Sequence, residues 1–76
     1  MYYRLKAKNW KKYNHALFAA ESNGFDPDVI DTDEYTFDVG TGAIEKVRHL
    51  ISKYNLDILI EDEFAPGPLS YAYIRR

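Results

Sequence analysis

The sequence contains no cysteine. This absence excludes disulfide bonds, thiolate metal sites and cysteine nucleophiles. Because small secreted domains usually need disulfides for stability, we expect a cytoplasmic protein. The sequence also lacks the apolar run of about 18 residues that a membrane-spanning helix requires. Its first six residues alternate polar and apolar side chains, which is not the pattern of a signal peptide, so we expect no membrane association.

A metal-binding motif is also missing, although several aspartates crowd one segment. Asp26, Asp28, Asp31 and Asp33 lie close together, but a calcium-binding loop that starts at Asp26 would need an oxygen ligand where Ile30 stands. We therefore interpret this segment as a solvated acidic loop, with a loose, weak cation site as the alternative, and expect no metal centre.

Motifs of cofactor binding and catalysis are equally incomplete. Residues 40–42 (Gly-Thr-Gly) precede a predicted helix but lack the Gly-Lys-Ser/Thr ending of a phosphate-binding loop, so we predict a strand-to-helix turn. His49 and Ser52 share one side of a predicted helix, yet no carboxylate is placed to orient the histidine. We expect a protein that is not an enzyme and takes no cofactor.

What the sequence does contain is enough apolar surface for one domain, which we expect to span residues 1–76. Twelve aromatic side chains supply large packing units. Asn9 suits the N-cap of a helix that starts at Trp10, and Gly24 suits the left-handed position after its end. The apolar stripe of this helix consists of Trp10, Tyr13, Leu17 and Ala20. A second helix, capped by Thr41, has a stripe of Ile44, Val47, Leu50, Ile51 and Tyr54.

Strands are predicted where polar and apolar residues alternate or where apolar residues are continuous. These segments are residues 2–7, 34–39, 56–60 and 69–74, with 29–30 as a short additional candidate and 65–68 as a rigid turn before the last strand. Because 56–60 is the most hydrophobic, we expect it near the middle of the sheet. The predicted fold class is α+β. Two helices pack on one face of a four- or five-stranded mixed or antiparallel sheet, as a two-layer sandwich of order β-α-β-(β)-α-β-β.

This order resembles that of ferredoxin-like domains and RNA-recognition folds, with one additional strand after the second helix. The sequence carries no motif of either family, so the resemblance transfers no functional residue.

Charge is divided into two blocks. Residues 1–15 carry five basic and no acidic side chains, whereas residues 16–45 carry eight acidic and no basic ones. Such asymmetry informs on partners rather than on fold. Our first hypothesis is an acidic surface that binds a basic protein, as an inhibitor or mimic aimed at a nucleic-acid-handling protein, in the manner of mobile-element antagonists. Its candidate residues are Asp26, Asp28, Asp31, Asp33, Glu34, Asp38, Glu61, Asp62 and Glu63.

Two alternatives use the basic block. In the first, this block binds nucleic acid directly, with aromatic and basic side chains on one strand face and the following segment. Its candidate residues are Tyr2, Arg4, Lys6, Lys8, Lys11 and Lys12. In the second, the basic block of one copy meets the acidic block of another, which would make the protein a self-associating structural subunit such as a homodimer.

Overall fold

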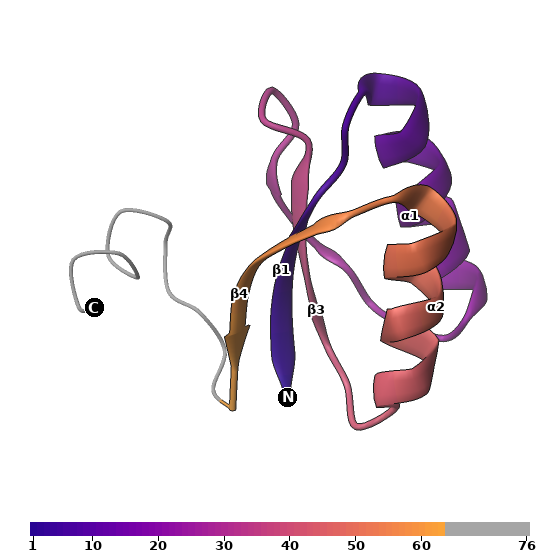
Figure 1. The fold of residues 1–76 in the computed structure, drawn as a ribbon, viewed down its shortest axis with the longest axis vertical. Helices are drawn as coiled ribbons and strands as arrows, with labels where there is room; N and C mark the ends of the chain where they lie inside the picture. The colour runs from indigo at the N-terminus through magenta and orange to yellow at the C-terminus, as the bar shows by residue number, and fades with distance from the viewer. Residues whose placement is uncertain (64–76) are drawn as a thin grey trace, which may run out of the picture.

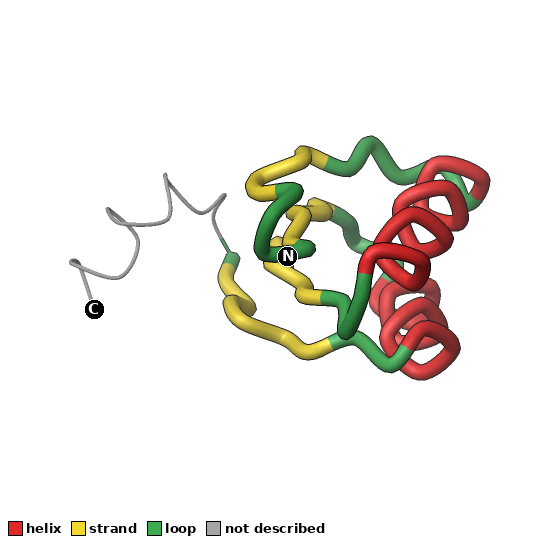
Figure 2. The backbone as a smooth tube through the Cα atoms, turned by 90° about the horizontal axis from the view of Figure 1, so that it is seen from above, coloured by secondary structure: helices red, strands yellow, loops and turns green. Residues whose placement is uncertain are grey.

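The computed structural model describes residues 1–63. The elements are β1 (Tyr2–Lys6), α1 (Trp10–Ser22), β2 (Asp28–Asp31), β3 (Thr36–Gly40), α2 (Ile44–Tyr54) and β4 (Asp57–Asp62). The four strands form one antiparallel sheet, and both helices cover the same face of it (Figures 1 and 2). The predicted two-layer α+β fold is thus confirmed. The predicted strand 69–74 and the turn 65–68 lie outside the described residues.

The strand order in the sheet is β2-β3-β1-β4. In this order β3 lies between the two strands of the first β-α-β unit, and β1 lies between the two strands of the second. The prediction that residues 56–60 lie near the middle of the sheet is wrong for the described part of the chain, where β4 is terminal and β1 and β3 are central. Ile58 and Leu59 are accordingly 48% and 38% exposed. Only Leu56, just before β4, and Ile60 are buried among the apolar residues of this segment.

The predicted signals at both ends of α1 are confirmed. The Asn9 side chain accepts a hydrogen bond from the amide of Lys12 at 2.9 Å. After the helix, Gly24 has a φ of 86°, and the amide of Phe25 donates to the carbonyl of Ala20 at 3.0 Å. This is the left-handed termination that glycine favours, and it directs the chain back toward the sheet.

The predicted cap of α2 is wrong. The helix begins at Ile44, and the preceding Ala43 provides no side-chain hydrogen bond. The Thr41 hydroxyl instead accepts from the amide of Ala43 at 2.8 Å, so it stabilises the turn after β3 rather than the helix. Asn55 ends the helix with a φ of 54°, as predicted.

The core lies between the helices and one face of the sheet. It consists of Tyr3, Leu5, Ala7, Tyr13, Ala16, Ala20, Phe37, Val39, Val47, Leu50 and Leu56. Trp10 was predicted to belong to this stripe but is more than half exposed. It lies in the first turn of α1, where its ring contacts Tyr13 and Tyr35 at centroid distances of 5.9 and 6.4 Å at the margin of the core.

Candidate functional site

The antiparallel topology sorts the charged residues between two ends of the sheet. β1 and β2 begin at one end, where β3 and β4 finish, and we call this the acidic end. The opposite end carries the turn between β2 and β3, and we call it the turn end (Figure 1). Because β1 runs toward the turn end, Lys6 at its last position and Lys8 just after it lie at that end.

At the turn end the lysines meet carboxylates of the same molecule. Lys6 Nζ lies 3.3 Å from Glu34 Oε2, and Lys8 Nζ lies 2.8 Å from Asp57 Oδ2. All four side chains are at least partly exposed, so each pair contributes little to stability. Their effect is on the surface charge, because the pairing reduces the positive charge that the basic block presents to solvent.

Asp31 stabilises the turn between β2 and β3. Its Oδ1 accepts hydrogen bonds from the amides of Asp33 and Glu34 at 2.9 and 3.1 Å. Such bonds are typical of aspartate at the start of a turn. The structure therefore places three predicted acidic site residues, Asp31, Asp33 and Glu34, at the turn end.

A buried ion pair joins the two central strands. Arg4 and Asp38 are register partners, and the guanidinium donates two hydrogen bonds to the carboxylate, Nε to Oδ1 at 2.8 Å and Nη2 to Oδ2 at 2.9 Å. Arg4 is 0% and Asp38 8% exposed. Both project from the sheet face opposite the helices, because the neighbouring Leu5 and Phe37 enter the core. Formation of this pair removes Asp38 from the acidic candidate surface and Arg4 from the basic one.

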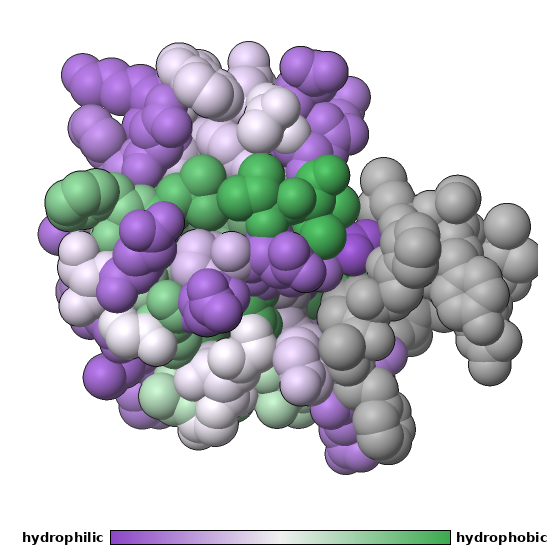
Figure 3. Space-filling model, turned by 180° about the vertical axis from the view of Figure 1, so that it is seen from behind, coloured by the Kyte–Doolittle hydropathy of each residue, from purple (hydrophilic) through white to green (hydrophobic). Residues whose placement is uncertain are grey.

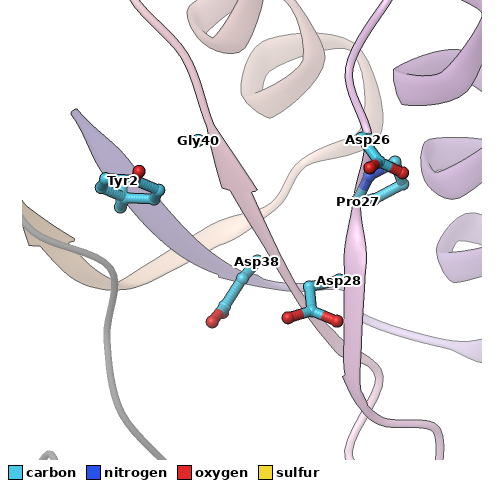
Figure 4. Close-up of a pocket in the computed structure, with 6 residues that line it drawn as sticks. All are labelled: Tyr2, Asp26, Pro27, Asp28, Asp38 and Gly40. Carbon is cyan, nitrogen blue, oxygen red and sulfur yellow. The ribbon is translucent and has the colours of Figure 1, made fainter.

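The acidic end contains a hollow of about 350 Å³. It is lined by Tyr2, Asp26, Pro27, Asp28, Asp38 and Gly40 (Figure 4). Asp28 is the register partner of Asp38, so two carboxylates project side by side from neighbouring strands. Like charges placed opposite each other are unfavourable. Arg4 compensates Asp38, whereas Asp26 and Asp28 are exposed.

The Tyr2 ring forms one wall of the hollow. Tyr2 and Gly40 are register partners, and a Cβ atom on Gly40 would lie only 2.4 and 2.7 Å from two carbons of the ring. Glycine therefore permits the ring to lie against the backbone of β3. The result is an aromatic surface beside the carboxylates of the hollow.

The remaining predicted acidic residues come from the end of β4. Asp62 is the register partner of Tyr2, and Glu61 and Glu63 flank it. Burial first, and then the neighbouring Glu61 carboxylate, raise the pKa of Tyr3. Strands β3 and β1 separate this group from Asp28, a span of roughly 14 Å at the usual strand spacing. The acidic end thus has two groups of carboxylates with Tyr2 and Gly40 between them.

The lining of the hollow suits an organic cation. Carboxylates attract an ammonium or guanidinium group, and an aromatic ring adds a cation–π contribution. Within residues 1–63, no group of three or more histidine and acidic side chains is arranged to hold a metal ion. Neither α1 nor α2 is long and apolar enough to cross a membrane.

Sequence reasoning identified the carboxylates of the hollow but not its complete wall. Tyr2 was assigned to the basic candidate surface, and Gly40 was assigned to a turn. The pairing of β1 with β3 brings both to the acidic segment, and no local pattern signals that pairing. Comparison with known protein-family models, with curated proteins and with solved structures found no match for this chain.

Proposed function

We propose that this protein is a small non-enzymatic binding domain that holds a basic protein through its acidic end. A lysine or arginine side chain of the partner occupies the hollow between Tyr2, Asp26 and Asp28. The observation that carries the proposal is the contrast between the two ends of the sheet. Asp26 and Asp28 are exposed and form no ion pair with residues 1–63, whereas lysines accompany the carboxylates of the turn end.

The physical basis is charge complementarity. A carboxylate gains a strong, charge-assisted hydrogen bond from a guanidinium or ammonium group, and clustered charge accelerates association with an oppositely charged surface. Many basic clefts on proteins normally hold nucleic acid. Carboxylates presented on a small rigid sheet occupy such a cleft in place of phosphates, which supports an inhibitor or mimic aimed at a nucleic-acid-handling protein.

The geometry gives less support to direct nucleic-acid binding. Of the six candidate residues on the basic surface, Arg4 is buried, Lys6 and Lys8 are paired with carboxylates, and Tyr2 lies at the acidic end. Lys11 and Lys12 remain at the start of α1. The same pairings weaken charge-driven self-association, because the basic block is largely engaged within one molecule.

The proposal is tested by fluorescence anisotropy with a labelled hexa-arginine peptide. We expect Asp26→Asn/Asp28→Asn to weaken binding by about tenfold or more, since hydrogen bonds to charged groups contribute about 1.5–3 kcal/mol. The matched control is Asp33→Asn/Glu34→Gln, which removes the same charge from two exposed residues at the turn end. Equal weakening by both variants, or no binding by the wild type, would contradict the proposal.

A further inference from the structure

We infer that the partner contributes an extended segment that adds to the open edge of β2, with basic side chains alternating with aliphatic ones. The inference rests on the proposed function and specifies the form of the basic partner. It is carried by three features of β2: its position in the sheet, its two different faces and the apolar surface beside it.

β2 is terminal in the strand order and pairs only with β3 in the part of the chain that the structure describes. Backbone N–H and C=O groups on the other edge of such a strand are available to another strand. Addition of an extended segment to an exposed edge is a common mode of peptide recognition, in which the main chain supplies affinity and alternate side chains supply specificity.

The two faces of β2 differ in chemistry. Asp28 and Asp31 are the register partners of Asp38 and Thr36, on the sheet face opposite the helices. Val29 pairs with Phe37 of the core, so it belongs to the helix-covered face, yet it is 49% exposed. Since successive side chains of a strand point to opposite faces, an added segment would place alternate residues against aspartates and against Val29.

Exposed apolar side chains occur on both β2 and α1. Figure 3 shows a band of hydrophobic side chains that crosses this side of the molecule, with polar residues above and below it. Phe18 of α1 is 74% exposed and Val29 of β2 is 49% exposed. An aliphatic side chain of an added segment would shield this apolar surface from water, which is favourable in proportion to the area covered.

Charge determines which occupant fits this edge. In a second copy of the chain, Asp28 and Asp31 would face the same aspartates across the new strand pair, and like charges at such positions are destabilising. A segment with lysine or arginine on that side instead forms ion pairs with Asp28 and Asp31. The basic residue of the segment that pairs with Asp28 also lies close to the hollow, because Asp28 belongs to β2 and lines the hollow.

The test compares three labelled peptides by anisotropy. The first repeats the Lys-Val pair four times, the second has four lysines followed by four valines, and the third has four lysines alone. We expect the alternating peptide to bind at least about tenfold tighter than the block peptide, with slowed hydrogen exchange at backbone amides of β2. Val29→Thr and Phe18→Ser should remove this advantage and leave binding of the lysine peptide unchanged.

The matched control is Ile58→Thr, because Ile58 is 48% exposed on β4, the other terminal strand of the described sheet. It should keep the preference for the alternating peptide. Equal affinity for the alternating and block peptides, with both dependent on Asp26 and Asp28, overturns the pairing with β2 but leaves the proposed function in place. If no peptide binds, the proposed function and the inference both fail. If the protein dimerises without peptide and Val29→Thr abolishes the dimer, a second copy occupies the edge of β2 and the inference is overturned.

Discussion

Arg4 and Asp38 are 34 residues apart in sequence and lie directly opposite each other on β1 and β3. Two hydrogen bonds of 2.8 and 2.9 Å join their side chains. The basic and acidic blocks of the sequence therefore meet inside one molecule, in the centre of the sheet. Asp38 also lines the hollow, so Arg4 compensates one of the hollow's carboxylates and leaves the exposed Asp26 and Asp28 without this compensation.

Replacement of Arg4 by methionine should lower the free energy of unfolding by about 3–5 kcal/mol, because it leaves the buried carboxylate of Asp38 without its counter-ion. Urea denaturation measures this loss. Arg4→Met/Asp38→Leu should be more stable than Arg4→Met alone, since the double variant buries no uncompensated charge. A double variant whose loss equals the sum of the two single losses would show that the pair is not coupled.

Alanine at Gly40 should destabilise the fold by about 1–3 kcal/mol, the usual cost of overpacking, because its Cβ would collide with the Tyr2 ring. Thermal unfolding measures the change. In Gly40→Ala/Tyr2→Ser the ring is absent, so we expect the double variant to lose less stability than the two single variants together. Strict additivity would show that Tyr2 does not restrict this position.

The pH dependence of stability should reflect two buried tyrosines. Burial, followed by the charge of Asp31, raises the pKa of Tyr13 above 10.0, and burial and Glu61 raise that of Tyr3. A folded-state pKa above the unfolded value means that the stabilising contribution is complete below about pH 10 and is lost as pH rises through the folded pKa. Urea titrations between about pH 8 and 11 should show this decline.

Tyr13→Phe separates the contribution of one hydroxyl. The Tyr13 hydroxyl donates to the carbonyl of Thr36 at 2.9 Å, so the variant should lose about 1 kcal/mol at neutral pH. Its stability should then fall less steeply than that of the wild type above about pH 10, because one raised pKa has been removed. Parallel curves for the two proteins would contradict the role assigned to Tyr13.

The wild type should pass through a heparin column at about 0.15 M salt, because carboxylates accompany its lysines at the turn end. Glu34→Gln/Asp57→Asn frees Lys6 and Lys8 and should produce measurable retention. The variant Glu21→Gln/Glu63→Gln changes the net charge equally at other positions and serves as the control. Retention of the wild type at this salt would favour the nucleic-acid alternative.

The sequence predicted those parts of the fold that depend on neighbours along the chain. The Asn9 cap and the Gly24 termination involve bonds within a few residues, so their signals are complete in the local sequence. The position of β4 in the sheet depends on which strands pair. The hydrophobicity of its sequence led to the wrong prediction that it lies near the centre of the sheet. The alternation of polar and apolar residues correctly predicted that Arg4 lies on the face away from the core. The burial of Arg4 depends on residues distant in sequence, such as Asp38.

The candidate site was predicted only in part for the same reason. Asp26 and Asp28 were recognised as acidic candidates from the sequence, and both line the hollow. Asp33 and Glu34 follow within a few residues, yet β2 carries them to the opposite end of the sheet at about 3.3 Å per residue. Tyr2 joins the hollow through strand register, which no sequence pattern specified.

The most direct test of the central claim is a map of backbone amide shifts in isotope-labelled protein titrated with unlabelled hexa-arginine peptide. We expect the largest shifts at Tyr2, Asp28 and Gly40, with Asp33 and Glu34 little changed, because the exposed carboxylates of the hollow attract the peptide. Shifts that are largest at Asp33 and Glu34, or spread evenly over both ends of the sheet, would contradict the account.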